Sequence, residues 1–189
     1  MTIINDAKEY AYQVHSKQTR KGKPDVPFTS HLDAVAEIAS KLTNDENIIA
    51  AAWLHDTVED TSTTIDGIRL TFGNTIADYV DAETENKFSH KDERGTWKAR
   101  KLGQLDHLRR EANINPDVLI IALSDKLANT TEMVNDYREV GDDLWNRFNS
   151  SRDDQKWYYN QFANVVSEND MIKNSDEYQR LLDNIKILF

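Results

Sequence analysis

The chain has 189 residues, of which 39% are hydrophobic and 30% are charged, and its formal net charge is −10. This length and balance are typical of one soluble globular domain, and the negative charge argues against binding to nucleic acid, whose phosphates attract basic surfaces. Cysteine is absent, which excludes disulfides, thiolate nucleophiles and thiolate metal ligands.

The N-terminal segment, MTIINDAKEYAYQ, carries charged residues where a secretion signal needs an apolar core. No apolar stretch in the sequence approaches the length that spans a membrane. We therefore predict a cytoplasmic protein. Apolar residues at helical spacing begin at Ile3 and predict a first helix over residues 3–18.

A basic segment follows this first helix. The sequence QTRKGKPDVPF, residues 18–28, contains one glycine and two prolines. These residues interrupt the helical pattern, and we predict a loop there. Ser30 and Asp33 then fit a capping box that opens a helix ending near Leu42.

Helical patterns continue through the rest of the chain. Asn44 or Asp45 can cap a helix that ends near the sequence EDT, and later helices are predicted at 64–72, 74–84, 96–112, 116–134, 151–168 and 175–187. The polar segment ENKFSHKDERG, residues 85–95, lacks periodicity and is predicted to be a mobile loop. No alternating strand pattern persists. We predict an all-α fold with one domain over residues 1–189.

The stretch WLHDTVEDT, residues 53–61, places polar side chains at the end of an apolar helix. Burying a charge costs free energy unless the charge is paired or binds a metal. Successive helical residues are rotated by about 100°, so a continuous helix would hold four polar side chains on one arc: His55, Asp56, Glu59 and Asp60. The adjacent histidine and aspartate on that arc can both reach one divalent ion.

Two other segments offer ligands that could complete such a site. His31 lies in the first turn of the preceding predicted helix, and Asp125, within ALSDKLANT, interrupts an otherwise apolar helix. Together with His55 and Asp56 they would supply two imidazoles and two carboxylates. This mixed set of nitrogen and oxygen ligands suits Mn²⁺, Fe²⁺ or Zn²⁺.

Simpler interpretations exist for each residue. A lone core histidine is more often a hydrogen-bonded structural residue than a ligand, and Asp125 alone could cap a neighbouring helix. Glu59 or Asp60 could merely orient a ligand, although beside a metal either could take a proton from an attacking water. The order H…HD…D, with an acidic pair behind HD, favours the metal site. His90 and His107 lie outside this order and are predicted to be surface residues.

These motifs resemble the HD-domain metal-dependent phosphohydrolases, which are all-helical. More narrowly, the chain resembles the hydrolase domain of RelA/SpoT-type alarmone enzymes over roughly residues 5–166. The matching motifs are RKGKPDVPFTSH (20–31), AAWLHDTVEDT (51–61), FG (72–73), VDAETENK (80–87) and SDKLANT (124–130). The chain is similar to the stand-alone small alarmone hydrolases, which remove the 3′-pyrophosphate from (p)ppGpp, usually with Mn²⁺.

The resemblance implies a role for each residue at a matching position. The metal ligands would be His31, His55, Asp56 and Asp125. The pair that orients and activates the attacking water would be Glu59 and Asp60. The nucleotide would be bound by Arg20, Lys21, Asn129 and Tyr158, and its phosphates would be approached by Lys98, Arg100 and Lys101 of WKARK. The alternative for RKGK is a solvated loop, and for WKARK a solvated helix face.

Three positions depart from the family pattern. The residues before the last ligand, commonly Lys and Ala in K-x-A-D, are Ala122 and Ser124, and a common arginine two residues after the asparagine is Thr131. None of these changes removes a ligand, so hydrolysis remains the prediction. Rival substrates are (p)ppApp and the phosphate of NADPH. A rival of another class is an HD module that binds a nucleotide or a partner without turnover, but the intact Glu59–Asp60 pair favours an enzyme.

Overall fold

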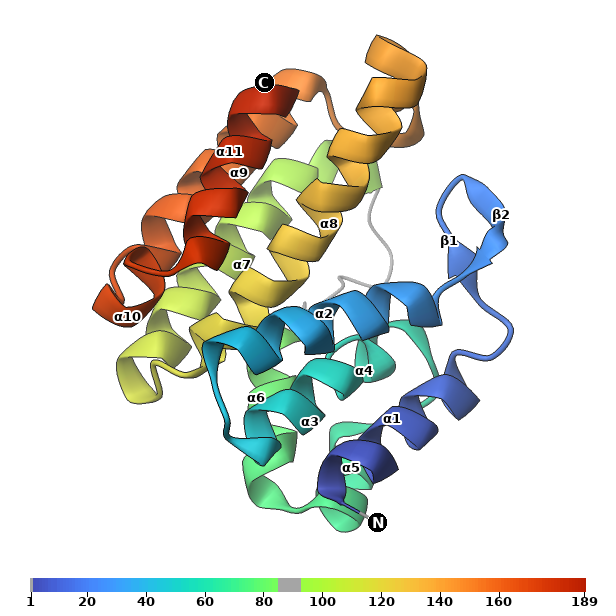
Figure 1. Ribbon diagram of the computed structural model, residues 1–189, viewed down its shortest axis with the longest axis vertical. Helices are drawn as coiled ribbons and strands as arrows, with labels where there is room; N and C mark the ends of the chain where they lie inside the picture. The colour runs from blue at the N-terminus through green and yellow to red at the C-terminus, as the bar shows by residue number, and fades with distance from the viewer. Residues whose placement is uncertain (1, 85–92) are drawn as a thin grey trace.

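The computed structural model describes residues 2–84 and 93–189. Within these ranges the chain forms a helical bundle with one small hairpin (Figure 1), which confirms the all-α prediction. Most of the polar segment 85–95, His90 included, lies outside the described residues, and its last three residues begin a helix. No helix in the described part of the chain is long and apolar enough to cross a membrane.

The elements follow one another in the order shown in Figure 1. They are α1 (Ile3–Val14), β1 (Thr19–Arg20), β2 (Lys23–Pro27), α2 (Thr29–Leu42), α3 (Glu46–Leu54), α4 (Thr57–Asp60), α5 (Ile65–Phe72), α6 (Asn74–Glu83), α7 (Glu93–Ile114), α8 (Val118–Val140), the 3₁₀ helix η1 (Gly141–Arg147), α9 (Arg152–Val166), α10 (Asp170–Lys173) and α11 (Asp176–Leu188).

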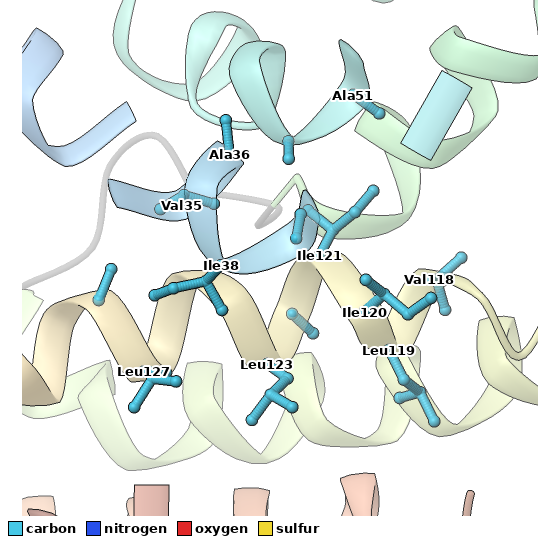
Figure 2. Packing of buried hydrophobic residues seen from close by; sticks show 14 of the residues in the cluster. Val35, Ala36, Ile38, Ala51, Val118, Leu119, Ile120, Ile121, Leu123 and Leu127 are labelled. Carbon is cyan, nitrogen blue, oxygen red and sulfur yellow. The ribbon is translucent and has the colours of Figure 1, made fainter. Parts of the chain in front are cut away.

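Helix α8 forms the centre of the bundle. It packs against α2 and α3 on one side and against α11 on another, and α7 also contacts it. Figure 2 shows Leu119, Leu123 and Leu127 along the side of α8 that faces away from α2, whereas Ile121 points toward α2 and α3. These side chains are buried. Because most of α8 from Val118 to Val134 is buried, a polar side chain inside this part of the helix needs a partner within the protein.

Hydroxyl, carboxylate and amide caps begin several helices, as the sequence predicts for α3. The Asp45 side chain accepts a hydrogen bond from the amide of Asn47 at 2.8 Å. The capping box predicted at Ser30 is wrong, because α2 begins at Thr29 and has no side-chain cap. Asp33 instead accepts a hydrogen bond from the Tyr12 hydroxyl at 2.6 Å, which ties α2 to α1.

The predicted basic loop is a β-hairpin. Strand β1 pairs antiparallel with β2, with Thr19 opposite Pro27 and Arg20 opposite Lys23. Gly22 in the turn has φ of +78°, a left-handed conformation that glycine adopts without a steric cost. A strand of two residues has no alternating pattern to detect, and α1 ends at Val14 rather than near residue 18 to leave room for the turn into it.

The single helix predicted up to residues 59–61 is broken near His55. Helix α3 ends at Leu54 and the one-turn helix α4 begins at Thr57. The Thr57 hydroxyl donates to the Leu54 carbonyl at 2.6 Å, so a side chain takes the carbonyl that the next turn of a continuous helix would use. The prediction of one continuous helical arc is therefore wrong in detail, and the chain bends at the HD dipeptide.

Candidate functional site

Four predicted ligands from three parts of the fold lie close together. His31 comes from α2, His55 and Asp56 from the bend between α3 and α4, and Asp125 from α8. His31 Nε2 lies 3.2 Å from Asp125 Oδ1 and 3.6 Å from Asp56 Oδ2. His55 Nε2 lies 3.1 Å from Asp56 Oδ2 and 3.8 Å from Asp125 Oδ1. Both imidazoles thus direct the same nitrogen toward the same two carboxylates.

The orientation of His55 fits a metal ligand. Its Nδ1 lies 2.9 Å from the Ala52 carbonyl, to which it donates a hydrogen bond. Nε2 is therefore the buried atom that is directed at the two carboxylates. Ligand atoms of His31, His55 and Asp56 all lie within 4.8 Å of one another. This buried set of nitrogen and oxygen atoms fits a divalent cation.

The two carboxylates of the cluster favour a positive charge beside them. Burial lowers the pKa of His55, but the charges of Asp56 and Asp125 outweigh burial and raise it to about 9. Burial raises the pKa of Asp56, but the charge of His55 outweighs it and lowers the pKa to about 2. A proton on His55 thus supplies part of the positive charge that the two carboxylates favour.

Asp125 also has partners on its own helix. The Lys126 ammonium contacts Asp125 Oδ2, and Asn129 Nδ2 donates to Asp125 Oδ1 at 2.6 Å. Burial raises the pKa of Asp125, but the charge of Lys126, followed by contributions from His31 and His55, holds it well below its usual range. Asp125 is therefore kept as a carboxylate in the interior of the bundle.

A cavity of about 260 Å³ lies beside this cluster, since Lys126 and Asn129 both line it. Among the described residues that line it, five are basic, namely Arg20, Lys21, Lys101, Lys126 and Arg147, and two are acidic, namely Glu132 and Asp136. Aromatic rings make up part of the remaining wall, contributed by Trp97, Phe148, Tyr158 and Tyr159. A cationic cavity with aromatic walls suits a small anion that carries an aromatic ring.

The β-hairpin is attached to the rim of this cavity by ion pairs with α8. Arg20 donates to Glu132 Oε2 from Nε at 2.9 Å and from Nη2 at 2.6 Å, and to Asn129 Oδ1 at 3.0 Å. Lys23 lies 3.0 Å from Glu132 Oε1 and 2.5 Å from Asp136 Oδ1. Arg20, one of the predicted nucleotide-binding residues, is therefore held in place at the cavity.

Of the remaining residues predicted to bind the nucleotide, some line the cavity and others do not. Tyr158 is buried and lines it, and its hydroxyl donates to Gln104 at 3.2 Å. Lys101 lines it too, whereas Lys98 is exposed with its ammonium 4.9 Å from the Trp157 ring centroid. Neither Lys98 nor Arg100 is among the described residues that line the cavity.

The predicted water-activating pair lies on the short helix α4. This helix follows the HD bend directly, so Glu59 and Asp60 come one turn after Asp56. Glu59 is half-buried and Asp60 is exposed. Of the other predicted surface residues, His107 is partly exposed and lies 3.7 Å from Glu111, as expected for a solvated helix face.

Sequence reasoning missed three residues of this region. Lys126 directly follows Asp125 within the same apolar run, and this place in the sequence indicates a buried cation beside the carboxylate. Arg147 reaches the cavity from η1 and bonds Asp136 at 2.7 Å, which the sequence gives no means of foreseeing. Glu83 lines a small cavity with Lys126, and no described group makes a hydrogen bond to its buried Oε1.

Comparison with known proteins agrees with this geometry. Residues 7–155 match the sequence model of the HD domain. The chain belongs to the HD-domain family. It is 33% identical over 133 residues to the guanosine-3′,5′-bis(diphosphate) 3′-pyrophosphohydrolase MESH1 of Xenopus tropicalis, and these residues cover 69% of each chain. It is 36% identical over 127 residues to the guanosine-3′,5′-bis(diphosphate) 3′-pyrophosphohydrolase of Aquifex aeolicus (strain VF5), covering 67% of this chain and 17% of that protein.

Two solved structures resemble this HD-domain fold. The crystal structure of lmo0812 from Listeria monocytogenes EGD-e has a TM-score of 0.70 and 29% identity, covering 82% of this chain and 96% of that one. A metazoan ortholog of SpoT, which hydrolyzes ppGpp, has a TM-score of 0.71 and 24% identity, covering 98% of this chain and 94% of that one. The resemblance predicted from the motifs is confirmed at the level of family and fold.

Proposed function

We propose that this HD-domain protein hydrolyses the 3′-pyrophosphate of (p)ppGpp, giving GDP or GTP and pyrophosphate. The observation that carries the proposal is the position of the His31, His55, Asp56 and Asp125 cluster beside a cavity with five basic side chains among its described lining. Relatives that are about a third identical are named for this activity. We further propose that residues 1–189 act as one phosphohydrolase domain in the cytoplasm.

We propose that these four side chains hold one divalent cation, with Mn²⁺ the first candidate and Zn²⁺ or Fe²⁺ as alternatives. The two imidazoles and two carboxylates supply four ligand atoms and leave positions for water and substrate. A bound divalent cation lowers the pKa of a ligated water and so supplies a nucleophile near neutral pH. The ion pair with Lys126 and the hydrogen bond from Asn129 keep the Asp125 carboxylate charged and oriented for the cation.

The chain's own residues then orient the water and the substrate. Glu59, with Asp60 beside it, would orient the attacking water and take its proton. Attack at the phosphorus bonded to the ribose 3′-oxygen forms one P–O bond and breaks the bond to that oxygen. The 3′-oxygen leaves with the nucleoside and takes up a proton, so one water molecule is consumed and pyrophosphate departs intact.

The cavity residues would hold the nucleotide during this attack. Arg20 can turn its guanidinium from Glu132 toward phosphate oxygens, which match its forked geometry, and Lys21 and Lys101 add positive charge. Asn129 hydrogen-bonds both Arg20 and Asp125, so it lies between the proposed nucleotide contact and the proposed metal ligand. Tyr158 would face the nucleoside. Lys98 and Arg100 are not among the described residues that line the cavity, so they would reach only the outer phosphate.

The comparison substrates are the two rivals considered from the sequence, (p)ppApp and NADPH. The test is to incubate the protein with each of ppGpp, ppApp and NADPH in the presence of Mn²⁺, Zn²⁺ or Mg²⁺, and to identify the products by chromatography. We expect GDP and pyrophosphate from ppGpp. Orthophosphate as the first product, or no turnover of ppGpp with any of the metals, would contradict the proposal.

If ppGpp binds without turnover, the chain is instead a nucleotide-binding module. Equilibrium binding of ppGpp to the metal-loaded protein distinguishes that case from a protein that does not recognise the nucleotide at all.

A further inference from the structure

His15 is a buried histidine outside the candidate metal cluster. It caps the C-terminus of α1 and has 1% of its surface exposed. We infer that His15 and Gln18 are positioning residues, which hold the α4 turn bearing Glu59 and Asp60 in place beside the metal cluster. This inference rests on the proposed function, because it gives Glu59 and Asp60 their part in water activation.

Two short hydrogen bonds connect His15 to the acidic turn. Gln18 Nε2 donates to the main-chain carbonyl of Asp60 at 2.6 Å, and His15 Nδ1 lies 2.6 Å from Gln18 Oε1. A carbonyl oxygen can only accept, so the amide nitrogen of Gln18 must face Asp60 and its oxygen must face His15. His15 therefore donates from Nδ1, and this bond fixes the rotation of the Gln18 amide.

The backbone of Gln18 is fixed as well. Its amide donates to the His15 carbonyl at 2.9 Å, and its carbonyl accepts from the amide of Phe28 at 3.0 Å. The Phe28 carbonyl in turn accepts from the amide of His31 at 2.9 Å. Gln18 thus lies where the end of α1, the base of the hairpin and the start of α2 meet, and its side chain extends from this junction to α4.

Helix α4 depends on such outside support because it is a single turn of four residues. One turn has little stability of its own, since helix formation has a costly nucleus. The last carbonyls of a helix also lack partners within it, and Gln18 supplies one for Asp60. Loss of that bond lets the turn shift, and a shift of about an ångström at a catalytic group can lower the rate on the order of 10²-fold.

A second contact gives His15 an alternative role that the experiment must separate. Its ring stacks on Phe28, with centroids 4.8 Å apart and planes at 23°, and Phe28 contacts the ring of His31 at a centroid distance of 5.7 Å. Through this contact His15 could support a metal ligand instead of α4. His15→Phe keeps an aromatic ring for stacking and removes the Nδ1 donor, so it separates the two roles.

The experiment compares His15→Phe, Gln18→Leu and Gln18→Glu with the parent and with Gln13→Leu, a matched change at an exposed glutamine of α1. Gln18→Glu retains an acceptor for His15 but has no amide donor for Asp60. The measurements are hydrogen exchange of the amides of residues 57–61, Mn²⁺ affinity by calorimetry, and kcat and KM for ppGpp. Melting temperatures and circular dichroism identify any variant that does not fold.

In the parent, the amides of Asp60 and Thr61 donate hydrogen bonds to the carbonyls of Asp56 and Thr57. We expect these two amides to exchange faster in all three variants. Mn²⁺ affinity and KM should stay near the parent values, while kcat falls on the order of 10²-fold in Gln18→Leu. Unchanged exchange over residues 57–61 in the folded variants would overturn the inference, and so would a loss of Mn²⁺ affinity as the main effect of His15→Phe. If the parent itself does not turn over ppGpp, the proposed function fails, but the exchange data still decide whether His15 and Gln18 hold α4.

Discussion

The Arg20 guanidinium donates two hydrogen bonds to the same oxygen of Glu132, from Nε at 2.9 Å and from Nη2 at 2.6 Å. This pair joins the hairpin to α8 at the rim of the basic cavity. Burial raises the pKa of Glu132, but hydrogen bonds from Arg20 and Lys23 outweigh it and lower the pKa overall. Arg20 is therefore held in place at the cavity before any anion binds.

The first prediction concerns this arginine. We expect Arg20→Ala to raise KM for ppGpp at least about tenfold, because a charge-assisted hydrogen bond contributes about 1.5–3 kcal/mol. Mn²⁺ affinity should stay close to the parent value, since Arg20 contacts Asp125 only through Asn129. Steady-state kinetics and calorimetry measure the two effects. The matched control is Arg69→Ala, which removes a surface ion pair with Asp78. Equal kinetics in both variants would mean that Arg20 stabilises the hairpin and does not bind the substrate.

The second prediction is that Glu59→Gln leaves the metal bound and slows turnover. A glutamine can still accept a hydrogen bond but cannot take up a proton, so we expect kcat to fall about 10²- to 10⁴-fold, as for the loss of a general base. Elemental analysis beside turnover rates measures both properties. The control is Glu37→Gln, at an exposed glutamate paired with Lys41 on α2. Full turnover in Glu59→Gln with metal retained would falsify the water-activating role.

The metal cluster could be predicted from the sequence because its residues conflict with their surroundings. Asp125 lies inside the apolar helix α8, and His55 follows an apolar run, so each needs a partner regardless of the exact fold. Helical periodicity likewise identified the long helices, whose ends differ from the predicted ones by up to six residues, as at the C-terminus of α8.

The features that sequence reasoning missed depend on contacts between distant segments. The hairpin has one strand of only two residues and is held by Glu132 and Asp136, which are more than a hundred residues away in the chain. The break at His55 arises from a hydrogen bond of the Thr57 hydroxyl, a residue that is equally compatible with a continuous helix. Periodicity reports which face of an element is buried, but it does not report such pairings.

The third prediction is that metal binding releases protons in a pH-dependent way. The pKa of His55 in the metal-free protein is raised from 6.5 to about 9, where the charges of Asp56 and Asp125 outweigh burial. The stabilisation from protonated His55 is therefore complete below 6.5 and is lost as the pH rises through 9. A metal ligand must be unprotonated, so at pH 7 the cation has to displace this proton, and the affinity should rise with pH up to about 9.

Calorimetric titration of Mn²⁺ into the metal-free protein, in two buffers with different ionisation enthalpies, measures the number of protons released. We expect close to one proton from His55 at pH 7 and clearly fewer at pH 9. His107→Gln, which alters a partly exposed histidine, should leave this number unchanged. Proton release that is equal at both pH values would contradict the assignment of His55 as a ligand.

The fourth prediction concerns Glu83, which lines a small cavity together with Lys126. Burial raises the pKa of its carboxyl from 4.5 to about 7, and the attraction of Lys126 only partly opposes this effect. The folded state therefore binds the Glu83 proton more tightly than the unfolded state does. This group favours folding fully below pH 4.5, and that contribution to the free energy of unfolding is lost as the pH rises to about 7.

Glu83→Gln removes this dependence, because an amide stays neutral at every pH. We therefore expect the metal-free variant to melt a few degrees above the parent at pH 8 and close to the parent at pH 5, measured by circular dichroism or calorimetry. Glu9→Gln, at an exposed glutamate of α1, should melt like the parent at both pH values. A lower melting temperature for Glu83→Gln at pH 8 would contradict this prediction. It would mean that the attraction between the ionised Glu83 carboxylate and Lys126 stabilises the fold by more than the burial of that carboxylate costs.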